Sequence, residues 1–170
     1  MLIFTLNNVY SQDLNNLDNK MGFNKFKLES SFELYKSKLK FTNVGSNKVK
    51  LYDYTGDDIK TIFGIPVYKI NLAFYKNRLY NISICFLNPN EAEQAKLRGS
   101  LIELFGYVVK DNDAKTNSDV EYDWAMLWES KKVRMQVVKY ATFHSPTPLW
   151  TTEIFMYSKL IHSQVQNDSF

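Results

Sequence analysis

Few residues of this sequence have the types and spacing that catalysis requires. The 170-residue chain has two histidines, His144 and His162, and a single cysteine, Cys85. A nucleophilic site needs a base close to an activated serine or cysteine, and neither histidine accompanies a G-x-S-x-G turn, which the sequence lacks. We therefore predict no catalytic residues. A lone cysteine excludes an intrachain disulfide and a zinc site built from several cysteines, so Cys85 is expected to be a small buried apolar residue.

One acidic segment has the ligand chemistry of a calcium loop. In "DNDAKTNSDVEYD" the carboxylate and amide oxygens that calcium prefers stand at Asp111, Asp113, Asn117, Asp119 and Glu121. Lys115 occupies what would be a ligand position, and no glycine provides the sharp turn of such a loop. A solvated surface loop is the favoured interpretation, and no metal site is predicted.

A second acidic group, Asp53, Asp57 and Asp58, surrounds Gly56 in "LYDYTGDD". Paired carboxylates can act as acid and base when they are buried close together. A turn followed by a helix cap explains the same residues more simply, and we favour this interpretation.

The composition predicts a folded domain without nucleic-acid or membrane-spanning functions. Hydrophobic residues make up 45% of the chain, with 12 Phe, 11 Tyr and 3 Trp, which is ample for a packed core. The net charge is +3, and among the 21 cations only Arg78, Arg98 and Arg134 are arginine, the residue that nucleic-acid readers favour for bidentate contacts. No apolar run approaches the roughly 18–20 residues that cross a bilayer. We expect no nucleic-acid partner, no transmembrane segment and no cofactor.

Residues 1–12 carry no charge and begin with an apolar run, whereas Asp13 opens a polar stretch. A secretory signal has a basic start, an apolar centre of about 7–15 residues and a small-residue cleavage site. Residues 1–12 lack the basic start, but they end in Ser11-Gln12, similar to the cleavage sites of exported proteins. We predict a signal-peptide remnant and a periplasmic or secreted protein; the alternative is a genuine N-terminal strand or arm.

Residues 13–170 are predicted to form one domain with two similar sub-blocks, 23–87 and 88–160. In the first, "SSFELYKSKLKF" (residues 30–41) predicts a helix, because its apolar residues recur at helical spacing after two serines that can cap it. In the second, "NPNEAEQAKLRGSLIELFGYVV" predicts a longer helix that is capped by Asn88 or Asn90 and ends at Gly106. Extended segments follow each helix, so the chain has the pattern of a tandem helix-plus-strands repeat.

The extended segments predict hairpins that each bury one face. To bury a single face, Phe74 must oppose Tyr80 across a three-residue loop, and Trp128 must oppose Val133 across a four-residue loop. A sheet that is apolar on one face needs a second layer on that face. The sequence therefore predicts an α+β fold, a two-layer sandwich in which an antiparallel sheet of five to seven strands has the helices packed on one face.

This order of elements, a helix followed by antiparallel strands written twice over residues 23–160, resembles the β-lactamase-inhibitor-protein-like architecture. It is also similar to the small outer-membrane-assembly lipoprotein domain. The hairpins "LAFYKNRLYNI" and "AMLWESKKVRM" share an aromatic residue, a charged turn and an aliphatic return strand. The resemblance implies a non-enzymatic binding or assembly module, and it carries over no site residues.

The aromatic residues near the C-terminal half supply the candidate contact surface. The segment "TFHSPTPLW" contains two prolines, and aromatic residues on a stiffened loop lose little entropy on docking. The alternative is that this segment is only a long connection between the last two predicted strands. Together with the polar face of the sheet, it gives these candidate binding residues: Lys132, Arg134, Gln136, Tyr140, Phe143 and Trp150.

The sequence thus predicts a non-enzymatic protein-binding module of the periplasm or cell exterior, in its sharpest form an inhibitor or immunity-type protein. The expected partner is another protein, and the chain itself is expected to be a monomer or a weak dimer. The alternative is a small ligand-binding protein or hydrolase with a pocket between sheet and helices.

Overall fold

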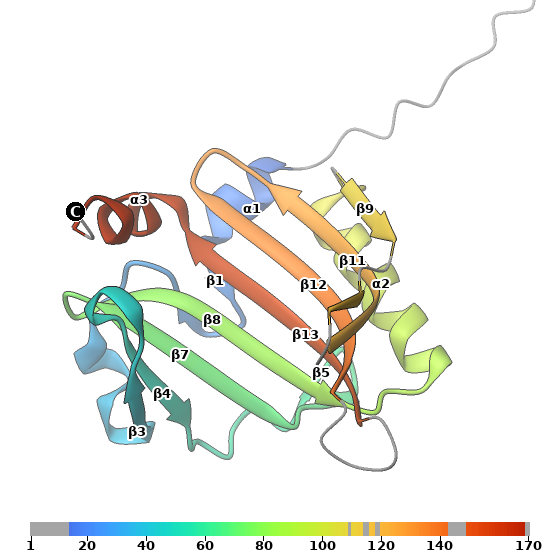
Figure 1. Cartoon of the computed structure of the whole chain (residues 1–170), viewed down its shortest axis with the longest axis horizontal. Helices are drawn as coiled ribbons and strands as arrows, with labels where there is room; N and C mark the ends of the chain where they lie inside the picture. Colours follow the sequence, from blue (N-terminus) through green and yellow to red (C-terminus); the bar gives the residue numbers. More distant parts are fainter. Residues whose placement is uncertain (1–13, 109, 114–115, 118–119, 143–148, 169–170) are drawn as a thin grey trace, which may run out of the picture.

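The structure, a computed structural model, describes residues 14–168 except 109, 114–115, 118–119 and 143–148, and the side chains of these residues except 46 and 110–120. None of the described helices is long and apolar enough to cross a membrane. The helices are α1 (Leu14–Lys20), α2 (Glu91–Phe105) and α3 (Lys159–Asn167), with short 3₁₀ turns η1 (Phe32–Leu34), η2 (Lys36–Lys38) and η3 (Ser46–Lys48). The strands are β1 (Gly22–Phe23), β2 (Phe26–Lys27), β3 (Leu39–Val44), β4 (Lys50–Tyr54), β5 (Thr61–Ile62), β6 (Ile65–Pro66), β7 (Lys69–Tyr75), β8 (Arg78–Leu87), β9 (Lys110–Asp113), β10 (Thr116–Asn117), β11 (Val120–Glu129), β12 (Val133–Thr142) and β13 (Leu149–Ser158) (Figure 1).

Nine of these strands form one antiparallel sheet, which confirms the predicted α+β class. Seven strands lie side by side in the order β11-β12-β13-β8-β7-β4-β3. The short strands β9 and β10 both pair with the outer edge of β11. Outside the sheet, β1–β2 and β5–β6 form separate small hairpins. The seven full strands agree with the predicted strand number.

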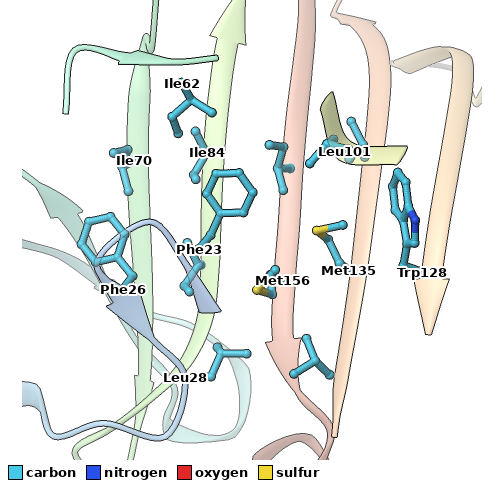
Figure 2. Packing of buried hydrophobic residues seen from close by; sticks show 14 of the residues in the cluster. Phe23, Phe26, Leu28, Ile62, Ile70, Ile84, Leu101, Trp128, Met135 and Met156 are labelled. Atoms are coloured by element: carbon cyan, nitrogen blue, oxygen red, sulfur yellow. The ribbon is translucent and has the colours of Figure 1, made fainter. Parts of the chain in front are cut away.

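One face of the sheet forms the main hydrophobic core. Side chains from successive strands, among them Ile84, Met156, Met135 and Trp128, point into one buried cluster (Figure 2). Residues of α2, such as Leu101, and of the β1–β2 hairpin belong to the same cluster. Burying one large apolar side chain contributes roughly 1.5–3 kcal/mol, so this cluster is the main hydrophobic source of stability.

The longest helix, α2, begins and ends where the sequence predicts. The Asn90 side chain accepts a hydrogen bond from the Glu93 amide, and the Glu93 carboxylate accepts one from the Asn90 amide, each at 2.9 Å. This reciprocal pair is a capping box. Gly106 follows the helix with φ of 75°, a conformation that glycine adopts readily. Its carbonyl accepts a 2.8 Å hydrogen bond from Trp128 Nε1, which ties the helix end to β11.

The C-terminal helix α3 packs against the opposite face of the sheet. Its buried residues Ile161 and Val165 belong to a second cluster with Ala73 and Tyr75. Side chains alternate along a strand, so Ala73 lies on the reverse side of the sheet from Leu72, which is in the main core. The prediction that the helices cover one face only is therefore corrected: α3 covers part of the second face.

The predicted helix over residues 30–41 is wrong. The turns η1 and η2 occupy its first part, and the chain from Leu39 onward is already paired with β4. Its aromatic spacing has another cause, because Phe32 packs against the rings of Tyr52 and Phe74 with centroid distances of 5.1 and 5.2 Å. Strand pairing outweighs helical periodicity here, so no α-helix opens the sub-block 23–87.

The β7–β8 hairpin has a different register near its turn from the predicted one. A bulge places Phe74 opposite Leu79 instead of Tyr80. The turn is the two residues Lys76 and Asn77, both with positive φ (46° and 60°), which is the geometry that matches the twist of paired strands.

The β11–β12 hairpin buries the predicted face, but its strands are shifted. Trp128 pairs with Met135, not with Val133. The shift is two residues, and a shift by two leaves every side chain on its original face. The predicted faces are therefore correct although the predicted partners are wrong.

Thr152 supplies a test of the packing on the core side of β13. Its hydroxyl is buried and has no hydrogen-bond partner among the described residues. Valine has nearly the same shape without the unsatisfied hydroxyl, so we expect Thr152→Val to raise the free energy of unfolding by about 1 kcal/mol in urea denaturation. The control Thr151→Val changes a half-buried neighbour on the other face, and we expect less than about 0.5 kcal/mol. A less stable Thr152→Val variant would contradict this view of the core.

Candidate functional site

The central part of the second sheet face is where polar and aromatic side chains gather. They alternate along β8, β12 and β13 with residues of the main core and therefore point away from it. A pocket of about 400 Å³ lies here and is lined, among the described residues, by β11, β12 and β13 alone. We call this surface the open face and define it by Ser83, Cys85, Tyr122, Gln136, Val138, Tyr140, Glu153 and Phe155.

Glu153 lies at the centre of the open face and is only 7% exposed. Its Oε1 accepts a hydrogen bond from the Ser83 hydroxyl, and its Oε2 accepts one of 2.9 Å from the Tyr140 hydroxyl. Ser83 lies on β8 and Tyr140 on β12, the two neighbours of β13. The carboxylate therefore joins three adjacent strands through hydrogen bonds.

The Glu153 carboxylate has no cationic partner in the described part of the chain. None of the ion pairs between described residues includes it. Lys69, two strands away in the same row, pairs instead with Asp53 at 3.0 Å. A carboxylate can accept about four hydrogen bonds, and a buried charge without a counter-charge is costly. Glu153 thus retains both acceptor capacity and an uncompensated charge beside a pocket.

The groups around Glu153 are hydrogen-bond donors and not nucleophiles. Burial and the negative charge of Glu153 raise the pKa of the Cys85 thiol to about 12. Burial and the same charge raise the pKa of the Tyr140 hydroxyl. Nucleophilic cysteines need a lowered pKa, because the thiolate is the reactive form. Both groups therefore stay protonated at neutral pH.

The structure brings together half of the predicted binding residues. Arg134, Gln136 and Tyr140 alternate along β12 and so share the second sheet face. Lys132 lies in the turn before β12, where its amide donates a 2.8 Å hydrogen bond to Asp18 Oδ1. It is exposed but stands apart from the pocket lining.

The prediction that Trp150 belongs to the contact surface is wrong. Phe143, another predicted binding residue, lies outside the described residues. Trp150 pairs with Ala141 and therefore points to the side of the sheet opposite Tyr140. The Lys139 ammonium lies 4.8 Å from the centre of its indole ring. Trp150 is consequently not part of the open face.

The described histidine, His162, contacts α3's neighbours on the sheet and not the Glu153 cluster. His162 lies on α3, where its Nδ1 is 2.7 Å from the Tyr80 hydroxyl and its ring centre is 4.9 Å from that of Tyr157. It fixes α3 to the sheet. His144 lies outside the described residues.

The acidic groups singled out in the sequence do not form a second site among the described side chains. No helix follows Asp58, which corrects the predicted helix cap; its carboxylate accepts a 2.6 Å hydrogen bond from Tyr54 and pairs with Lys38 at 3.2 Å. The ammonium of Lys25 and the Tyr54 hydroxyl lower the pKa of Asp58. In the segment "DNDAKTNSDVEYD", for which a solvated loop is predicted, the side chains of residues 111–120 lie outside what the structure describes.

Sequence reasoning misses the residue at the centre of the site. Glu153 is a charged residue in the middle of the strand segment "TTEIFM", between buried Thr152 and Ile154. This position between two buried residues indicates that Glu153 lies on the reverse face of the sheet, but not what it contacts there. Its partner Ser83 is 70 residues away in the sequence, so the pair becomes visible only when β13 is placed beside β8.

The raised pKa of Cys85 predicts slow alkylation. Cys85 is the only cysteine, so iodoacetamide labels this site alone. We expect the folded protein at pH 8 to react at least about 100-fold more slowly than the urea-unfolded chain, because the folded thiol is almost fully protonated. The folded rate should keep rising above pH 9, following the thiolate population.

Glu153→Gln is the matched variant for this measurement. It removes the negative charge that helps to raise the thiol pKa, so the folded protein should react faster at pH 8. Equal rates in folded and unfolded protein, or a plateau near pH 9, would show that the thiol is not held protonated.

Comparison with protein-family models, with curated proteins and with solved structures finds no match for this chain. What supports a function is therefore the geometry of the open face.

Proposed function

We propose that this chain is a non-enzymatic binding module that contacts another protein through the open face. Its sharpest form is an inhibitor or immunity-type protein that works in the periplasm or at the cell exterior. The observation that carries the proposal is Glu153, a buried carboxylate without a described cationic partner on a face that α3 covers only in part. Burying an apolar residue at this position would cost less free energy than burying a carboxylate. Proteins keep destabilising residues of this kind mainly where function needs them.

The composition of the open face supports a protein partner. Tyr122, Tyr140 and Phe155 border the pocket together with Gln136. Tyrosine and phenylalanine are enriched in protein interfaces, where they combine a large apolar area with few rotatable bonds. The strands hold these side chains in place, so little order has to be gained on binding.

The same chemistry argues against an enzyme at this site. The Cys85 thiol and the Tyr140 hydroxyl have raised pKa values, whereas nucleophiles need a lowered pKa or an adjacent base. His162, the described histidine, contacts Tyr80 and Tyr157 and not the Glu153 cluster.

A small-ligand carrier is the second candidate, because a cavity exists on the helix side of the sheet. It has a volume of about 220 Å³ and is bordered by Lys20, Phe23, Ile62, Phe63 and Phe105 among others. Pockets for drug-sized ligands measure about 300–1,000 Å³. This cavity suits a small apolar molecule at most, so the open face is the better supported site.

Affinity capture from the native periplasm with an open-face variant tests the proposal. We expect the wild-type protein to retain a stoichiometric partner, identified by mass spectrometry. Gln136→Arg places a bulky cation beside Glu153 and should reduce capture at least about tenfold. Gln166→Arg is the control, since it makes the same change at an exposed position of α3, and capture should persist.

Two results would overturn the proposal. One is a partner whose capture is unaffected by Gln136→Arg, which would place the contact elsewhere. The other is the absence of any stoichiometric partner together with turnover of a small substrate by the purified protein.

A further inference from the structure

We infer that the Glu153 pocket is the receptor for a basic side chain, an arginine or lysine, presented by the protein partner. This inference rests on the proposed function and names the chemical group that the open face recognises. It starts from the charge of Glu153, which is 7% exposed and belongs to no ion pair among the described residues.

The walls of the pocket have the chemistry that binds an organic cation. Tyr122, Tyr140 and Phe155 line it beside the carboxylate. The rings of Tyr122 and Tyr140 are 6.1 Å apart and inclined at 50° to each other. The faces of aromatic rings attract ammonium and guanidinium groups. A pocket lined by a carboxylate and aromatic rings therefore binds a cation more tightly than a neutral group or an anion.

The two hydroxyl donors hold the carboxylate in place for this contact. Ser83 binds Oε1, Tyr140 binds Oε2 and the Cys85 thiol is a third donor, so the carboxylate is already oriented and keeps part of its capacity of about four hydrogen bonds. A fixed carboxylate can meet a guanidinium through two parallel hydrogen bonds, the strongest common geometry for such a pair. Orienting the acceptor before binding reduces the entropy that binding costs.

The shape of the site favours a side chain on a larger partner over a free small molecule. The described lining comes from three neighbouring strands of one sheet face, so one layer forms the floor and sides. Ligand sites normally bury about 70–90% of a free ligand. A partner protein provides the missing cover from the other side and excludes water from the ion pair, so we expect a short peptide to bind the same site measurably but more weakly than the whole partner.

The cations whose side chains the structure describes form no ion pair with Glu153, and this includes Arg134, which lies on the same face four residues from Val138, the residue opposite Glu153. Lys69 pairs with Asp53 at 3.0 Å, and Lys139 pairs with Asp123 at 2.6 Å. Lys159, at the start of α3, pairs with Glu129 at 3.0 Å. The charge on Glu153 is therefore left for a group from outside the described part of the chain.

Capped tripeptides test the inference and do not require the partner to be identified. Three peptides carry arginine, lysine or the neutral isostere citrulline at the centre of one alanine frame. We expect the arginine and lysine peptides to produce saturable NMR shifts in the amides of β12 and β13 around Glu153. The citrulline peptide should produce none, because it lacks the positive charge.

Two variants and a control locate the binding in the pocket. Glu153→Gln keeps the size of the side chain; one hydroxyl can still donate to its amide oxygen and the other can rotate to accept from its NH₂ group, so the variant should fold. It should weaken arginine binding at least about tenfold. Tyr122→Leu, at the pocket edge, removes an aromatic wall and should weaken it about threefold. Glu129→Gln, a partly exposed carboxylate that pairs with Lys159, should leave binding unchanged.

Each outcome decides between the inference and the proposed function. Absence of saturable binding, equal binding of the citrulline peptide, or equal binding to Glu153→Gln overturns the cation site. A captured protein that is lost with Gln136→Arg but kept with Glu153→Gln preserves the proposed function and rejects this inference. Peptide binding without any captured partner, together with turnover of a small substrate, preserves the cation site and rejects the protein-binding function.

Discussion

The alternation of side chains along β13 is the constraint on which the rest of this protein depends. Ile154 and Met156 enter the main core and are almost completely buried. Because neighbouring residues of a strand point to opposite faces, Glu153 and Phe155 must lie on the reverse side. β13 occupies the middle of the sheet between β12 and β8, so hydroxyl donors from both neighbours reach Glu153. The same packing that stabilises the fold thus positions the carboxylate.

The two faces of the sheet differ in how completely they are covered, and the proposed function assigns recognition to the less covered one. The core face is closed by α2 and the β1–β2 hairpin, with Trp128 bonded to the carbonyl of Gly106. The second face is closed at one end by α3, through Ile161 and Val165. Between that helix and the β11 edge, the open face keeps a polar network that a core would not tolerate without partners. This network has hydroxyl partners for hydrogen bonding but no described partner for its charge.

Local sequence patterns predict the fold class well and the site poorly. Capping residues and a helical apolar stripe identify α2, and period-two alternation identifies the buried faces of both long hairpins. The helix predicted after Ser31 is wrong because the apolar residues there serve another purpose. Phe32 packs against Tyr52 and Phe74 of neighbouring strands, and its spacing from the next apolar residues only happens to match that of a helix. The short helices α1 and α3 are missed because α1 buries only Leu17 and α3 continues directly from β13. Alternation of polar and apolar residues along β12 predicts that Gln136 and Tyr140 lie on the second face. The contact of Glu153 with Ser83 depends on the pairing of β13 with β8, which no local sequence pattern encodes.

The structure of the complex with the captured partner tests the central claim most directly. The account predicts that the partner covers the open face and places an arginine or lysine nitrogen within about 4 Å of the Glu153 carboxylate, the ion-pair distance. A partner bound instead along α2 or the β3 edge, or one that covers the open face with an apolar or acidic group against Glu153, would contradict it.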